Sequence, residues 1–143
     1  GGVPGDAQVR LNWTHLLYET EDGPGNTVGS VGSPENKFQG GILYNVGAWN
    51  FNWETTYTAD VVPSLVGGSQ FNFNVGEYVI HDLRIGWDVS ESANIYFGAN
   101  NVFDEDAPII LSGIPGNSTG TDTNATVYDP IGRTWYAGVR LRY

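Results

Sequence analysis

The chain has 143 residues, a formal net charge of -10 and only six Lys or Arg side chains, which argues against binding to nucleic-acid phosphates. Aromatic residues make up 13% of it, charged residues only 15%, and there are 20 Gly and no Cys. This composition is unlike that of a helical enzyme, excludes disulfides, and suits a chain with a lipid-facing surface.

Alternation of apolar and polar residues predicts the strands. It begins at residues 7–14, where Ala, Val, Leu and Trp alternate with Gln, Arg, Asn and Thr. The same period of two recurs, more weakly in the first case, at residues 37–44, 49–57, 82–89, 93–100 and 134–143. A period of two places successive side chains on opposite faces of a strand. About six strands of roughly 10 residues each, with no apolar run of ~20 residues, predict an all-β fold: an antiparallel transmembrane β-barrel segment.

The connections between these strands are of two kinds. Short turns are expected at residues 45–47 and 90–92, and long polar segments at residues 19–36, 58–77 and 104–127. Short and long connections alternate along the chain, so the long ones all fall at one end of the sheet. Outer-membrane barrels have short periplasmic turns and long extracellular loops, so we expect the long segments at the cell surface.

Aromatic residues gather near the strand ends. Tyr44, Trp49, Trp87 and Tyr143 share the apolar parity beside short turns or the terminus, and Tyr18, Tyr57, Tyr78 and Phe103 lie beside the long segments. We interpret the two sets as girdles at the two membrane interfaces. The residues predicted to face lipid are Trp49, Trp53, Trp87, Trp135, Val139 and Leu141.

Two C-terminal motifs resemble those of TonB-dependent outer-membrane receptors. Residues 95–104 read Ile-Tyr-Phe-Gly-Ala-Asn-Asn-Val-Phe-Asp, and residues 132–138 read Gly-Arg-Thr-Trp-Tyr-Ala-Gly. The resemblance implies that residues 1–143 are the C-terminal part of a 22-stranded barrel whose lumen holds a plug domain. It also implies that the terminal aromatic Tyr143 is a signal for the barrel-assembly machinery.

Most of such a receptor is not visible in this sequence. Residues 1–143 contain no recognisable plug domain, TonB-contacting segment or signal peptide, and about six strands are too few to close a barrel. The expected partners are therefore outer-membrane lipid, the remaining strands and plug of the same receptor, TonB acting through that plug, and a nutrient ligand. We expect the cell outer membrane as the location.

The sequence shows little sign of catalytic or metal chemistry. His15 and His81 are the only imidazoles, and no local spacing indicates a Ser-His-Asp arrangement, so we expect no enzyme activity and no cofactor. Carboxylates at the start of the longest connection are candidates for ligand binding, but their spacing does not match an EF-hand, so no metal site is assigned. These loop candidates are Asp104, Glu105, Asp106 and Asp122.

Charged residues of the opposite parity would line a barrel lumen. They are expected to pair across strands or to contact a plug. The residues are Glu54, Asp82, Arg84, Arg140 and Arg142.

The function expected from these features is uptake of a scarce nutrient, such as an iron chelate, cobalamin or an oligosaccharide, energised through TonB. Two alternatives remain open at this stage. One is a passive or structural outer-membrane barrel, since lipid imposes the same pattern on all such proteins. The other is a soluble β-sandwich binding module, in which the aromatic residues would fill an ordinary core.

Overall fold

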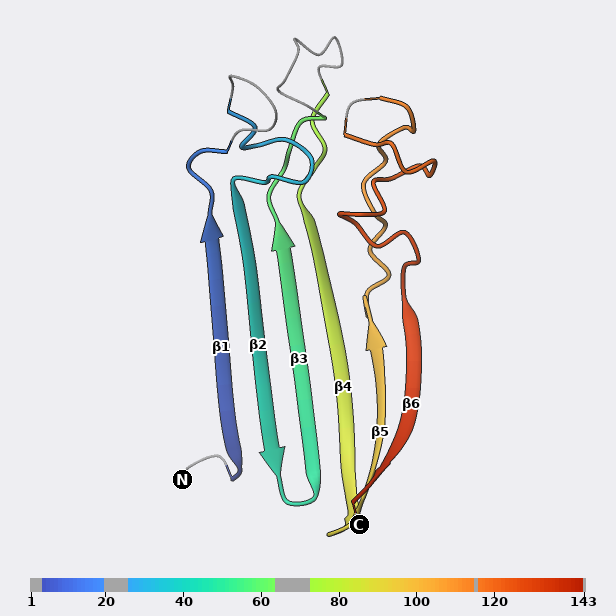
Figure 1. Ribbon diagram of the computed structural model, residues 1–143. Helices are drawn as coiled ribbons and strands as arrows, with labels where there is room; N and C mark the ends of the chain where they lie inside the picture. The colour runs from blue at the N-terminus through green and yellow to red at the C-terminus, as the bar shows by residue number, and fades with distance from the viewer. Residues whose placement is uncertain (1–3, 20–25, 64–72, 115, 143) are drawn as a thin grey trace.

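A computed structural model describes residues 4–19, 26–63, 73–114 and 116–142 of the chain. These residues form one antiparallel sheet of six strands in sequence order (Figure 1). The strands are β1 Asp6–His15, β2 Asn36–Val46, β3 Trp49–Thr58, β4 Tyr78–Ser90, β5 Ala93–Asn100 and β6 Thr134–Leu141. Within the described residues, no helix is long and apolar enough to cross a membrane. The six predicted strands are confirmed.

The strand register places the apolar residues of each strand opposite the apolar residues of its neighbours. Across β1 to β4, for example, Val9 lies opposite Ile42, Ile42 opposite Trp53, and Trp53 opposite Leu83. The pairing continues from Leu83 through Ala99 to Trp135 on β6. Because side chains of one parity share a face, the sheet has an apolar face, which carries these residues, and a polar face on its other side.

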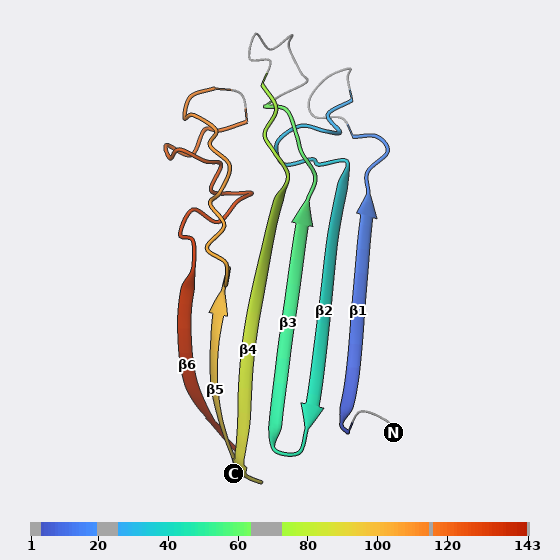
Figure 2. The same cartoon turned by 180° about the vertical axis from the view of Figure 1, so that it is seen from behind.

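Connections of different length lie at opposite ends of the sheet. β2 and β3 are joined by two residues, 47–48, and β4 and β5 by residues 91–92, at the end called here the turn end. The three long connections lie together at the other end, the loop end, in both views (Figures 1 and 2). β1 begins and β6 ends at the turn end. The predicted alternation of short and long connections is confirmed.

The loop end has a small hydrophobic core of its own. Its buried members come from β4, from the connection between β3 and β4 and from the connection between β5 and β6; they are Val61, Val75, Tyr78, Ile110 and Tyr128. The rings of Tyr78 and Tyr128 meet edge to face, with centroids 5.4 Å apart, and burial raises the pKa of the Tyr128 phenol. Main-chain hydrogen bonds of 3.0 Å and 2.8 Å also join Val31 to Val62 and Val62 to Gly29. The long connections are therefore packed against one another.

Tyr78 does not belong to an interfacial girdle, contrary to the prediction. Its even number gives it the parity of Asp82 and Arg84, so it lies on the polar face, where it is buried in the loop-end core. An aromatic ring at a strand end can lie on either face of the sheet, and the position of its residue in the alternation decides which face it takes.

Glycines on the polar face make room for aromatic side chains of the adjacent strand. Tyr96 of β5 lies opposite Gly138 of β6, and Tyr136 of β6 lies opposite Gly98 of β5. A Cβ atom on either glycine would collide with the ring or hydroxyl of the tyrosine that covers it. This reciprocal packing fixes how β5 and β6 align.

Candidate functional site

The apolar face carries the residues predicted to face lipid. On β6, Trp135, Val139 and Leu141 are 58%, 61% and 69% exposed, because no other part of the described chain covers this face. Trp49 and Trp87 pair across β3 and β4 at the turn end, with stacked ring centroids 5.8 Å apart. Trp53 lies four residues after Trp49 on the same face. By their register, the described strands carry no Asp, Glu, Lys or Arg on this face.

Aromatic residues are spread along the apolar face from the turn end towards the loop end. At the turn end, the Tyr44, Phe51 and Trp49 rings follow one another at centroid distances of 6.3 Å and 6.5 Å. Towards the loop end, Phe97 stacks on Trp135 with centroids 5.4 Å apart, and Trp53 contacts Phe103. Phe51 and Phe97 lie in one cross-strand row with Ile85 between them, so the aromatic rings are interspersed with aliphatic residues along the face. A face of aromatic and aliphatic residues suits the lipid-facing side of a membrane-spanning barrel wall.

The polar face is hollowed across β1 to β4. The hollow has a volume of about 520 Å³ and is lined by amide and charged side chains that include Arg10, Asn52, Glu54 and Arg84. Since the hollow lies on the side opposite the apolar face, the sheet presents a concave polar surface. Such a surface is what the inside of a barrel wall offers to water or to a polypeptide that fills it.

The predicted ion pairs on the polar face are not found. None of Glu54, Asp82, Arg84, Arg140 and Arg142 joins an ion pair within the described part of the chain. The register explains this, because Glu54 lies opposite Asp82, a residue of like charge, while Arg84 lies opposite Asn52.

The charged groups of the polar face use other partners. The Arg84 guanidinium lies over the Tyr96 ring, 4.4 Å from its centroid, which is a cation–π contact. Asp82 Oδ1 accepts a 2.8 Å hydrogen bond from the Asn101 backbone N–H, and Glu54 accepts one from Asn52. Asp82 thus holds the start of the longest connection to the sheet.

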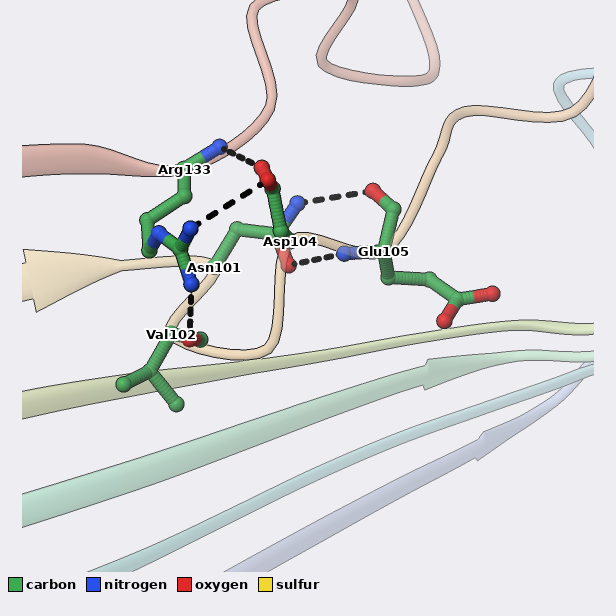
Figure 3. A network of polar contacts seen from close by, with 5 residues as sticks. All are labelled: Asn101, Val102, Asp104, Glu105 and Arg133. Atoms are coloured by element: carbon green, nitrogen blue, oxygen red, sulfur yellow. Dashed lines mark hydrogen bonds and ion pairs between the residues drawn. The ribbon is translucent and has the colours of Figure 1, made fainter.

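The longest connection is tied at its base by a network around Asn101 and Asp104 (Figure 3). The Asn101 side chain bonds the Glu105 main chain twice, at 2.8 Å and 2.9 Å. The Asp104 carboxylate accepts a 2.8 Å hydrogen bond from the Arg133 backbone N–H and forms an ion pair with the Arg133 guanidinium, with N and O 3.4 Å apart. The same guanidinium donates a hydrogen bond of 3.3 Å to the Val102 carbonyl. Asn101 and Asp104 have φ of 49° and 62°, values that Asn and Asp tolerate better than other non-glycine residues.

This network gives a structural role to residues of both C-terminal motifs. Asn101 and Asp104 end the first motif, and Arg133 belongs to the second, 29 residues later in the chain than Asp104. Sequence reasoning quoted these residues but did not assign them to one another. The signal was present in the Asn-Asn-Val-Phe-Asp and Gly-Arg pattern, but the contact spans a long connection and could not be derived from local spacing.

The loop carboxylates do not gather into one site. Asp104 and Glu105 belong to the network around Asn101 and Asp104, and Asp106 beside them is exposed. Asp122 lies further along, where its main-chain carbonyl accepts a 2.8 Å bond from Ile110 N–H. Residues 4–19, 26–63, 73–114 and 116–142 contain no group of three or more His, Asp or Glu side chains placed to hold a metal ion. Tyr143, the predicted assembly signal, lies outside the described residues.

Comparison with solved structures finds this fold in a ferric enterobactin receptor of Pseudomonas aeruginosa. One mutant of that receptor matches with a TM-score of 0.70 at 19% identity, over 96% of this chain and 20% of the receptor chain. A second mutant, in complex with enterobactin, matches with a TM-score of 0.66 at 18% identity, over 94% and 20% of the two chains. No protein-family model and no curated protein matches the sequence.

The chain spans about a fifth of the length of the receptor structures that it matches. At this level of identity the likeness shows the fold, which is that of a barrel segment of a TonB-dependent receptor. The fold class predicted from alternation and loop asymmetry is confirmed, and so, at the level of fold, is the resemblance drawn from the two motifs. The matched structures are receptors and not enzymes.

Proposed function

We propose that this chain supplies barrel wall and surface loops to an outer-membrane receptor that takes up a nutrient. The observation that carries the proposal is the sheet itself, with one mainly apolar face that bears no Asp, Glu, Lys or Arg in the described strands and one face that is polar and hollowed. Lipid on one side and an aqueous or plugged lumen on the other require this division. The matched receptor fold supports the same assignment.

The wall is completed by strands beyond β1 and β6. Each of these strands has one neighbour in the described sheet, so its outer edge presents unpaired backbone N–H and C=O groups. In hydrocarbon each unpaired group costs several kcal/mol, so spanning sheets close on themselves. We therefore propose that the chain is the C-terminal part of a larger barrel, about 22 strands in all, with a plug in its lumen and energy supplied through TonB.

The three long connections form the outer surface of this receptor. Their described part carries many carboxylates and few cations, and the Arg133 guanidinium is already engaged by Asp104. Asp104, Glu105, Asp106 and Asp122 remain our candidates for contact with the nutrient, and the exposed Asp106 is the first to test. The candidate nutrient classes are iron chelates, cobalamin and oligosaccharides.

Two measurements test the proposal. The protein should fractionate with outer membranes and require detergent for extraction; recovery in buffer alone would overturn the membrane assignment. A deletion strain should lose uptake of one labelled nutrient from the three classes, and a strain without functional TonB should lose the same uptake. Uptake that survives loss of TonB would favour a passive barrel.

A soluble β-sandwich would need a second sheet over the apolar face. All six described strands belong to one sheet, and the large apolar residues of that face are exposed, Val139 and Leu141 among them. A sandwich buries such residues between its two sheets. The observed exposure therefore favours a membrane wall over a sandwich.

A further inference from the structure

Two polar side chains face each other within the apolar face. Thr55 of β3 lies directly opposite His81 of β4, and their side-chain atoms Oγ1 and Nδ1 are 2.8 Å apart. The residues next along the same face are apolar or aromatic, with Trp53 and Leu83 on the turn-end side and Tyr57 and Val79 on the loop-end side. The proposed function does not use this polar pair.

A chain of hydrogen bonds joins Trp53, Thr55 and His81. The Trp53 indole N–H donates to Thr55 Oγ1 over 3.0 Å. The bond between Thr55 Oγ1 and His81 Nδ1 runs in either direction, depending on the tautomer of His81. We take the direction in which the Thr55 hydroxyl donates to Nδ1, because this gives the hydroxyl hydrogen a partner among the described residues. An imidazole that accepts at Nδ1 carries its hydrogen on Nε2 when neutral. The described residues offer no acceptor for that Nε2–H group.

Aromatic rings hold the imidazole in place. The Trp53 ring lies 5.2 Å from it at 37°, and the Phe103 ring lies 5.2 Å away on edge, at 84°. Phe103 and Trp53 also contact each other, with centroids 6.0 Å apart. His81 therefore belongs to an aromatic cluster with Trp53 and Phe103, on the loop-end side of Trp53. Aromatic rings towards the end of a barrel strand meet lipid head groups and acyl esters.

We propose that His81 Nε2 donates a hydrogen bond to a phosphate or acyl-ester oxygen of a lipid in the outer leaflet. This inference rests on the proposed membrane location and adds a specific lipid contact to it. The described strands bear no carboxylate on the apolar face, so a lipid oxygen is the acceptor that we propose. A buried N–H without a partner is costly in an apolar medium, and lipid oxygens are the acceptors available at this depth.

The test counts lipids retained by the protein. The complete protein is purified from outer membranes in a mild detergent, and bound lipids are measured by native mass spectrometry. His81→Phe keeps an aromatic ring but removes the donor, and Thr55→Val removes the hydroxyl that orients it. Each should lower the occupancy of one lipid roughly fivefold, the effect of a single neutral hydrogen bond.

Two further variants separate the hydrogen bond from packing. His81→Gln restores an N–H donor and should retain the lipid, whereas Leu83→Ile, a packing change on the same face, should leave its occupancy unchanged. Equal lipid occupancy in the natural protein and in His81→Phe would overturn the inference. So would loss of lipid in Leu83→Ile to the same extent as in His81→Phe.

Failure of this inference can be told from failure of the proposed function. All variants are first checked for outer-membrane location and for the gel-mobility shift on heating that a folded barrel shows. If the natural protein is absent from the outer membrane, the proposed function fails. If it is present, and His81→Phe is folded yet holds the same lipid, only the lipid contact is wrong.

Discussion

Replacing Ile42 and, separately, Leu43 by Arg tests the assignment of the two faces at a single depth. The two residues are neighbours in β2 but lie on opposite faces of the sheet. Ile42 lies opposite Val9 and Trp53 on the apolar face, whereas Leu43 lies opposite Gln8 and Asn52 on the polar face. Both changes introduce the same charge in place of an aliphatic side chain, so each serves as the control for the other.

The expected costs differ because the two faces meet different media. Ile42 lies near the middle of β2 and is 48% exposed in the described sheet, where no carboxylate shares its face. An Arg on the lipid face near the midplane of a barrel costs about 2–4 kcal/mol. An Arg at Leu43 projects into the polar hollow and can approach Glu54 diagonally, so its cost should stay within about 1 kcal/mol.

The measurement is the free energy of unfolding of the complete barrel in phosphatidylcholine bilayers, from urea titrations followed by tryptophan fluorescence. Ile42→Arg should lower the midpoint strongly and Leu43→Arg only slightly. A larger loss for Leu43→Arg would reverse the two faces. Small and equal losses would mean that the apolar face does not meet hydrocarbon.

Three further predictions concern the loops and the β5–β6 pair. A single Cys in place of Asp106 should react with a membrane-impermeant reagent on whole cells and one in place of Glu91 should not; the opposite pattern would invert the orientation. Arg133→Ala should speed proteolysis within residues 101–133. It should change barrel stability by less than about 1 kcal/mol, because the ion pair with Asp104 is exposed. Unchanged proteolysis would contradict the role of the Asn101–Asp104–Arg133 network in holding this connection. Gly138→Ala should cost about 1–3 kcal/mol through collision with Tyr96, and Tyr96→Ala should relieve it in the double variant; strictly additive losses in stability would count against the packing.

The predictions from sequence were most accurate for features that depend on a single strand or turn. Alternation at residues 134–143 predicted β6 Thr134–Leu141, and the short connection at residues 90–92 predicted the turn between β4 and β5. The number of residues between successive strands also predicted that the long connections all lie at one end of the sheet. A pleated strand fixes which face each side chain takes, so these features need no knowledge of the partner strand.

Errors arose where the outcome depended on which residues lie opposite one another. Glu54 was expected either to pair across strands or to contact a plug, and the register excludes a pair with the residue directly opposite it, because that residue is Asp82. Tyr78 was expected at a membrane interface, but the folding of the longest connection over the polar face buries it against Tyr128. Neither result can be read from one strand.

The sequence by itself determined the strands, their faces and the end of the sheet at which the long connections lie. It did so because a period of two is a property of each strand alone, and lipid demands an unbroken apolar row on one face. Only the tertiary structure decided that Thr55 meets His81, 26 residues later, and that Asp104 meets Arg133, 29 residues later. Contacts of this kind depend on strand register and on the path of a long connection, which are set by packing across the whole sheet.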